Sequence, residues 1–260
     1  MPDTAVAVHQ PNFLPWLRLL DKILASDIYV AYDTVQYTKS EYHGRQRVRT
    51  YTGELWLTVP LLTVPRTRQI IADVRIDNSQ PFRHRHLRLL RSAYGRTEFF
   101  GEVFPIVEEV YARDHERLVD LNVELIAALC DYLGSDVKIV RASSLPHTGD
   151  STDRLIALVR AVGGDVHLTS TYGTRRQYID WHRVQAAGIT VRSQVFDHPV
   201  YPQAWRGFIP HLAALDMLFT CGRATAKILQ AGRRFDTIND VPGRTQVPVA
   251  ARSETPAATR

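Results

Sequence analysis

Residues 5–49 constrain the fold of this chain more than any other stretch. The apolar, partly β-branched run Ala5–Val8 ends in the turn-forming residues His9–Asn12, a pattern that predicts a buried strand followed by a polar turn. Pro15 suits the first turn of a helix, and residues 28–32 read as the next strand, with Asp33 just past its end. The stretch is therefore one β-α-β unit, and open α/β sheets bind ligands at the carboxyl ends of their strands.

The helix between these strands is predicted from two faces of different polarity. The apolar face carries Leu17, Leu20, Ile23 and Leu24, and the opposite face carries Arg18, Asp21, Lys22 and Ala25. A helix N-terminus beside polar strand ends favours an anion. Polar strand ends also occur in α/β domains that bind nothing there, so the pattern alone does not decide between these interpretations.

Alternating hydrophobicity and helical periodicity extend this pattern along the chain. A β-hairpin is predicted at 45–61 around Thr52-Gly53, and further strands at 70–76, 138–143, 166–170 and 189–196. Helices are predicted at 82–93, 101–113, 118–133, 153–162 (with Ser151 or Thr152 as N-cap), 178–187 and around 212–219. The fold class is α/β, a Rossmann-like, mostly parallel sheet flanked by helices, with an inserted β-hairpin and a helical segment. Residues 1–241 form one domain, and residues 242–260 are expected to be disordered.

Composition narrows the class of ligand. The chain has 260 residues and a formal net charge of +5, which favours an anionic ligand such as a nucleotide, a sugar nucleotide or RNA, although an arginine-rich composition alone would give the same balance. The sequence also lacks the signals of a membrane or secreted protein. No apolar run approaches the roughly 20 residues that cross a bilayer. Two cysteines cannot build a disulfide framework, and the N-terminus lacks the pattern of a signal peptide. We expect a cytoplasmic protein with no membrane segment.

Arginines alternate along the first arm of the hairpin. Arg45, Arg47 and Arg49 lie two residues apart, so a strand places them on one face. Such a face is either solvated or a phosphate clamp, because guanidinium forks match phosphate oxygens. We favour the clamp, with Lys39 as a neighbour.

His84 and His86 do not share a helix face, and no metal site is expected.

Three blocks of the sequence resemble one family. They are HQPNFLPW with LLDKILASDIYVAYDTVQYTKSEY, then GELWLTVPL with the later RHRHLRLLRSAYGRTEFF, and FDHPVYPQAWRGFIPHLAALDMLFTCG. In order and spacing they are similar to the WbqC-like family over residues 5–230. The family pattern has Asn-Arg-Asn-Arg where this chain has Gly44, Arg45, Gln46 and Arg47, so the two arginines match and the asparagines do not. It also favours a glycine-rich stretch near residue 170.

The resemblance implies acyl or aminoacyl transfer, because members occur in O-antigen and natural-product gene clusters and a glycyl transfer to an amino sugar has been proposed for some. The expected substrate is a small-molecule amine, nucleotide-linked or free, with the acyl donor activated by ATP or carried on tRNA. No Walker A or G-x-G-x-x-G motif is present, so a P-loop is not supported.

Candidate site residues follow from these interpretations. His9 or His198 would be the general base, with Asp33 as a further catalytic candidate, although each histidine could instead cap its proline-rich turn. The candidates for binding substrate or anion are Gln10, Asn12, Trp16, Lys22, Gln36, Lys39, Arg45, Arg47, Ser143, Ser144, Tyr172, Tyr201 and Gln203. The alternatives are an adenylate-forming amide ligase, a non-catalytic binding protein for sugar nucleotides or RNA, and a thiol enzyme acting through Cys221.

Overall fold

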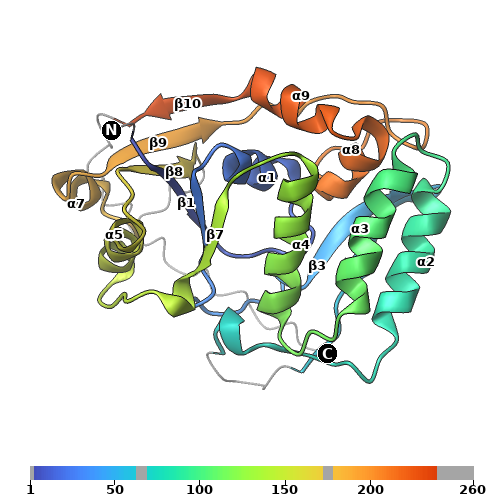
Figure 1. Ribbon diagram of the computed structural model, residues 1–260, viewed down its shortest axis with the longest axis horizontal. Coiled ribbons are helices and arrows are strands. Elements are labelled where there is room, and N and C mark those ends of the chain that lie inside the picture. The colour runs from blue at the N-terminus through green and yellow to red at the C-terminus, as the bar shows by residue number, and fades with distance from the viewer. Residues whose placement is uncertain (1–2, 63–68, 172–177, 239–260) are drawn as a thin grey trace, which may run out of the picture.

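The structure, a computed structural model, is built on a six-stranded sheet (Figure 1). It describes residues 3–62, 69–171 and 178–238; the proposed binding residue Tyr172 and the predicted disordered tail 242–260 lie outside these ranges. The strands are β1 (Ala5–His9), β2 (Ile28–Ala31), β7 (Lys138–Arg141), β8 (Val166–Ser170), β9 (Thr190–Val195) and β10 (Arg234–Thr237). Their order across the sheet is β10-β9-β8-β1-β2-β7.

The pairing makes the sheet mostly parallel. β1 pairs with β2 on one side and with β8 on the other, in the registers Val6↔Ile28 and Ala5↔Val166. β2 pairs with β7 and β8 pairs with β9, also parallel, and only β10 runs antiparallel to its neighbour. The chain builds outward from β1 through β2 to β7 and then returns to the other side of β1 for β8 and β9. This arrangement confirms the predicted Rossmann-like class.

Helices cover both faces of the sheet, as Figure 1 shows. On one face α1 (Leu17–Leu24), α4 (Leu118–Tyr132), α8 (Ala214–Cys221) and α9 (Ala224–Gly232) supply side chains that pack with Ala7, Tyr29 and Leu168. On the other face α5 (Ser151–Ala161) and α7 (Trp181–Ala186) pack against Val6 and Val30. Alternate residues of β1 thus enter different cores, as the pleat of a strand requires.

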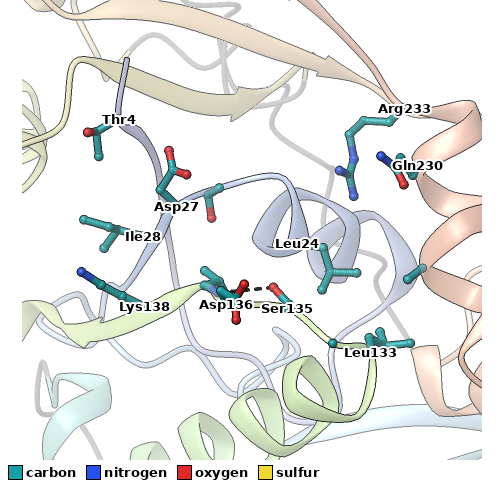
Figure 2. Close-up of a pocket in the computed structure, with 14 residues that line it drawn as sticks. Thr4, Leu24, Asp27, Ile28, Leu133, Ser135, Asp136, Lys138, Gln230 and Arg233 are labelled. Carbon is teal, nitrogen blue, oxygen red and sulfur yellow. Dashed lines mark hydrogen bonds between the residues drawn. The ribbon is translucent and has the colours of Figure 1, made fainter. Parts of the chain in front are cut away.

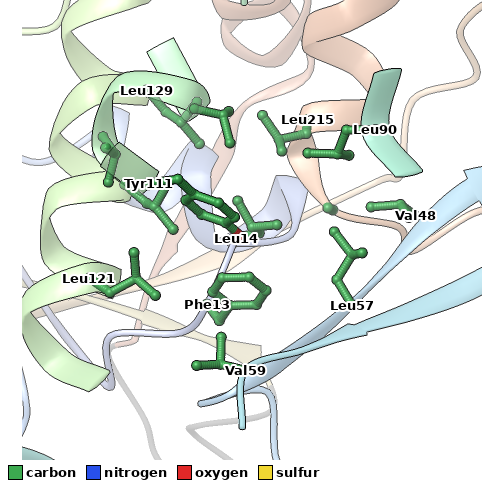
Figure 3. Close-up of a cluster of buried hydrophobic side chains, with 14 of the residues drawn as sticks. Phe13, Leu14, Val48, Leu57, Val59, Leu90, Tyr111, Leu121, Leu129 and Leu215 are labelled. Carbon is green, nitrogen blue, oxygen red and sulfur yellow. The ribbon is translucent and has the colours of Figure 1, made fainter. Parts of the chain in front are cut away.

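A long insertion between β2 and β7 builds a second hydrophobic core beside the sheet. It contains the antiparallel hairpin of β3 (Arg45–Thr50) and β4 (Gly53–Thr58), a small pair β5 (Leu61–Leu62) and β6 (Arg75–Ile76), and the helices α2 (Phe82–Tyr94), α3 (Phe100–Ala112) and α4. Figure 3 shows Phe13 and Leu14, from the turn after β1, in the middle of this core with Leu57 and Leu121 around them. Both are fully buried, so the turn that follows β1 is fixed by the inserted segment.

Two local expectations were wrong, and two elements were missed. The predicted strand 70–76 is the short 3₁₀ helix Ile71–Asp73 followed by the two-residue β6. Helix α5 is capped by Asp150, which accepts hydrogen bonds from the backbone N–H groups of Thr152 and Asp153; an aspartate accepts as well as serine or threonine at this position. The final helix α9 and strand β10 were not predicted.

The polar side of α1 is not solvated, contrary to the simple two-face expectation. Asp21 and Lys22 are 1% and 4% exposed. Asp21 accepts hydrogen bonds from Gln194 of β9 and from Arg233, which precedes β10. The unpredicted C-terminal elements therefore cover a helix face that sequence periodicity assigns to solvent.

Candidate functional site

The carboxyl ends of β1 and β8 lie next to each other where the order of strands reverses. The chain leaves β1 toward β2 and leaves β8 toward β9, so the two connections diverge and leave a crevice, which is where open α/β sheets bind ligands. Helix α1 begins at Leu17, shortly after β1, and its first turn has no acidic residue. The helix N-terminus therefore adds partial positive charge at the crevice.

His9 is the last residue of β1, and its ring is set up to accept a proton through one nitrogen. Its Nδ1 lies 2.9 Å from the carbonyl oxygen of Gln10. A carbonyl only accepts, so Nδ1 carries the hydrogen and Nε2 keeps its lone pair in the neutral ring. Burial, followed by the charge of Lys22, lowers the pKa of His9 from 6.5 to about 3. The ring is therefore neutral at physiological pH.

Lys22 gives this region a buried positive charge. Burial, followed by the charge of Arg18, lowers its pKa from 10.5 to about 8, so the ammonium is still the main form at pH 7. No carboxylate of the described residues forms an ion pair with Lys22 or Arg18. The two are one helical turn apart and on the same side of α1. Two like charges held together without a counterion favour an anion from outside the chain.

A pocket of about 200 Å³ opens at the start of α1. Its walls are Trp16, Leu17, Arg18, Tyr42, Phe196, His198 and His211. The Trp16 ring lies edge-on to His9 with centroids 6.0 Å apart, and it contacts Tyr42 at 5.0 Å. Arg18 sits over the Phe196 ring at 5.8 Å. The pocket, which we call the α1 pocket, thus combines flat aromatic surfaces with a cation, a lining suited to a planar or sugar ring that carries negative charge.

His198 lines the α1 pocket, but both of its nitrogens are engaged. Its Nδ1 donates to the Pro199 carbonyl, 2.9 Å away, and its Nε2 accepts the backbone N–H of His211 at 3.1 Å. His211 has a positive φ of 62°, a conformation that needs support from its surroundings. The geometry therefore gives His198 the role of holding the 198–211 loop and leaves His9 as the better-placed proton acceptor.

Gln10 and Asn122 hold the turn after β1 in place. Gln10 Oε1 accepts from His43 Nε2 at 3.0 Å, and Asn12 is 2% exposed. Asn122 of α4 donates to the carbonyls of Pro11 and His43 at 2.9 and 2.8 Å. Burial lowers the pKa of His43 to about 4, so this network stays neutral. These side chains keep the backbone of the turn, and with it His9, in one position.

Asp33, Ser143 and Ser144 form a different cluster at the ends of β2 and β7. Asp33 is fully buried and accepts from the Ser143 backbone and hydroxyl at 2.8 and 2.7 Å and from Arg141 Nε at 2.9 Å. Arg141 also donates to Asp120, and Ser144 donates to the Arg141 carbonyl. With its oxygens occupied, Asp33 ties two strands together, and the structure does not bring it to the α1 pocket.

The arginines of β3 share a face as predicted, but protein groups engage them. Arg47 donates to both oxygens of Glu54 at 3.0 and 2.8 Å and to the His211 carbonyl. Arg45 lies over the Trp56 ring at 4.4 Å and donates to the Ser40 carbonyl. Glu54 therefore neutralises Arg47, whereas Arg18 and Lys22 have no ion-pair partner among the described residues. Gln36 and Lys39 are exposed.

Tyr201 and Gln203 belong to a buried network around Asp216. Asp216 is fully buried and accepts from Tyr94 at 2.8 Å and from Gln203 at 2.9 Å, so this carboxylate has partners. Burial raises the pKa of Asp216 and of Cys221 at the end of α8. A raised thiol pKa disfavours the thiolate, so the geometry gives Cys221 no activation.

A larger hollow lies at the opposite edge of the sheet. It has a volume of about 700 Å³, and Figure 2 shows Thr4, Asp27 and Lys138 on its wall, at the amino ends of β1, β2 and β7. Arg233 also lines it but is paired with Asp21 at 2.8 Å. Ligands of parallel sheets bind at the carboxyl ends, so size alone does not make this hollow the site.

The sequence prediction missed five residues of the α1 pocket. Leu17, Arg18, Tyr42, Phe196 and His211 line it, and none was a candidate. Arg18 could have been predicted as a site residue, because it lies four residues before the candidate Lys22 and therefore on the same face of the predicted helix. Tyr42 and His211 reach the pocket from loops whose path depends on the inserted core.

No group of three or more His, Cys, Asp or Glu residues in the described ranges is arranged to hold a metal ion. Among the same residues, no helix combines the length and the apolar character needed to cross a bilayer.

Comparison with known proteins identifies relatives of this chain. A family model described as the WbqC-like protein family matches residues 10–228. The chain is similar to the uncharacterized protein Rv1507c of Mycobacterium tuberculosis, with 29% identity over 231 residues that cover 88% of this chain and 99% of the relative. No solved structure matches.

Proposed function

Because this chain belongs to the WbqC-like protein family, we propose that it is an acyl or aminoacyl transferase that forms an amide on the amine of an amino sugar or natural-product intermediate. The observation that supports the proposal is a neutral His9 with an available Nε2 lone pair, close enough to Lys22 for that charge to lower its pKa. Lys22 and Arg18, one helical turn apart on α1, have no ion-pair partner among the described residues. A base and an anion site side by side are the parts that such a transfer requires.

Each of these residues would have a distinct role in the transfer. The acceptor nitrogen attacks the acyl carbon of the donor ester, and His9 Nε2 takes the proton that the nitrogen loses as the C–N bond forms. The C–O bond to the donor then breaks, and the departing oxygen takes this proton back from the imidazolium. Lys22 and Arg18 hold the anionic part of the donor or acceptor. That negative charge also raises the basicity of His9, because it offsets the Lys22 charge that lowers its pKa.

An adenylate-forming amide ligase is the second candidate, favoured by the sheet. The order β7-β2-β1-β8-β9 with its reversal between β1 and β8 is the arrangement in which doubly wound sheets bind nucleotides. ATP–pyrophosphate exchange in the presence of carboxylic acids separates the candidates, since only a ligase that makes an adenylate returns labelled pyrophosphate to ATP.

The test of the proposal begins with a thermal-shift screen of ATP, sugar nucleotides and aminoacyl-tRNA. A ligand at 100 times its dissociation constant stabilises the native state by about 2.7 kcal/mol. Once a donor and an acceptor that react are identified, His9→Gln should lower turnover roughly 100-fold or more and change the ligand dissociation constant by no more than a few-fold. The control His182→Gln, at an exposed position on α7, should change neither quantity. Full turnover in His9→Gln would refute the assignment of the base, and binding without turnover by the wild-type protein would support a non-catalytic binding protein.

A further inference from the structure

Two neighbouring hollows form one groove on the side of the molecule that carries α2. They have volumes of about 520 and 600 Å³ and share Ser92, Ala93 and Trp205. Their walls come from α2, from the turn of the β3–β4 hairpin and from the 203–205 loop. Neither hollow includes a residue of the α1 pocket, so this groove, which we call the α2 groove, is a separate surface.

The α2 groove carries an excess of arginine. Arg85 and Arg88 lie three residues apart on one side of α2, and Arg96 follows shortly after its end. All three are exposed, and no described carboxylate forms an ion pair with them. Glu98 is the one carboxylate among the residues that line the two hollows.

The remaining cations of α2 contrast with these three. Arg91 pairs with Glu108 at 3.4 Å, and Arg83 donates to Asn78 at 2.7 Å. Within the described residues, the two arginines of α2 that do not line the groove thus have partners, whereas Arg85 and Arg88, which line it, have no ion pair.

Aromatic rings complete the groove. Tyr51, next to the hairpin turn, is 79% exposed, and its ring meets Trp205 edge-on with centroids 5.4 Å apart. The Trp205 Nε1 is buried and has no hydrogen-bond partner among the described residues, which leaves a donor for a ligand or a water molecule. Arginines beside an exposed aromatic face are the pattern with which proteins hold unpaired bases on a charged backbone.

The hairpin connects the α2 groove to the α1 pocket. Arg47 donates to the His211 carbonyl, Arg49 donates to the Arg206 carbonyl, and Tyr51 contacts Trp205. Arg47 and Arg49 lie on one face of β3, and Tyr51 follows two positions later, directly after the strand ends at Thr50. From Tyr51 to Arg47 the chain rises about 13 Å, which corresponds to roughly four nucleotides at the 3.4 Å spacing of stacked bases.

We propose that the α2 groove binds a single-stranded polynucleotide whose end reaches along β3 to the α1 pocket. Arg85, Arg88 and Arg96 contact its phosphates, and Tyr51 stacks on a base. The part of this inference that concerns the α1 pocket rests on the proposed function, in which the strand would be the RNA carrier of the acyl donor. The binding of the strand in the α2 groove stands on the contacts of that groove alone.

Fluorescence anisotropy with a labelled 12-nucleotide RNA, single-stranded or in a duplex, tests the groove in the full chain. Arg85→Ala/Arg88→Ala should weaken single-strand binding at least ten-fold and reduce the slope of log K against log salt by about 1.4, since each phosphate contact to a single strand contributes about 0.7. Tyr51→Ala should weaken binding about ten-fold, whereas Tyr51→Phe, which keeps the ring, should bind like the wild type.

The control is Arg192→Ala/Arg234→Ala, which removes the same charge from β9 and β10, far from α2 in Figure 1. It should leave binding within two-fold. The proposal would be overturned if both double variants lost the same affinity, or if Arg85→Ala/Arg88→Ala bound the RNA as the wild type does. It would also be overturned if the duplex bound more tightly than the single strand, or if polyglutamate displaced the labelled RNA as well as unlabelled RNA does.

The two proposals fail separately. His9→Gln should bind the RNA as the wild type does, because the assay involves no chemistry. If RNA binding depends on the α2 groove but no acylated RNA serves as a donor, the binding proposal is supported and RNA-dependent acyl transfer is refuted. If the protein transfers an acyl group from a donor that contains no RNA and does not bind RNA, the transferase proposal is supported and the binding proposal is refuted.

Discussion

Replacing Lys22 with methionine should stabilise this protein at neutral pH. Lys22 is 4% exposed, and burial is the main cause that lowers its pKa from 10.5 to about 8. At about 1.4 kcal/mol for each tenfold change in proton affinity, holding the charged form in the fold costs about 3 kcal/mol. Methionine has a similar length and no charge, so it removes this cost with little change in packing.

The pH dependence gives the sign of this effect. Between pH 8 and 10.5 the unfolded chain keeps a proton on Lys22 that the folded chain has released, so the stability of the wild type rises with pH across this window. The variant lacks this group and does not gain the increment. The stability difference should therefore be about 3 kcal/mol at pH 7 and close to zero above pH 10.5.

Chemical denaturation at several pH values measures the difference, and thermal unfolding at pH 7 should show an increase of roughly 6–12 °C in Tm for a chain of this size. The exposed Lys227→Met on α9 is the matched control and should have little effect. Anion binding should be lost in Lys22→Met. A variant that is less stable at pH 7, or a stability gap that is the same at pH 7 and pH 10.5, would refute the reasoning, since Lys22 would then have a compensating partner.

Three further substitutions test the framework around the site by urea denaturation. Asp33→Ala removes the acceptor of two Ser143 hydrogen bonds and one of the two carboxylates that bind Arg141, which keeps Asp120, and should cost about 1–3 kcal/mol; unchanged stability would show that these contacts do not hold β2 and β7 together. His198→Phe removes the acceptor of a backbone N–H and should cost about 1–3 kcal/mol without altering the pH profile of turnover, which a catalytic base would change. Gly222→Ala places a methyl group 2.4 Å from Phe99 at a φ of 54° and should cost roughly 2–4 kcal/mol; a neutral result would mean that the ring moves freely.

The sequence predicted the central sheet because its signals are local. The strand at Ala5–His9, the helix after Pro15 and the strand at Ile28–Ala31 each carry a clear period and sit between turn residues, so the first β-α-β unit and its polar strand end could be placed. The strand predicted at 70–76 failed because its apolar residues are fixed by the inserted core, which shortens the regular segment to two residues.

The electrostatics of the site could not be predicted in the same way. Lys22 looks like a solvated residue by periodicity, and its burial depends on segments far along the chain, as does that of Asp21 beside Arg233. β10 is a short, mostly exposed edge strand, so it carries almost no hydrophobic pattern. Arginine alternation correctly placed Arg45 and Arg47 on one face, but only the fold shows that Glu54 already neutralises one of them.

The turn after β1 joins two cores. Phe13 and Leu14 belong to the core of the inserted segment, whereas Leu17 and Leu19 belong to the core beneath the sheet. Most loops open locally at little cost, and their amide hydrogens exchange quickly with solvent. This turn cannot open unless both cores separate, so its backbone amides should exchange only as fast as the whole molecule unfolds. The residues that position His9 should therefore be among the slowest-exchanging of the chain.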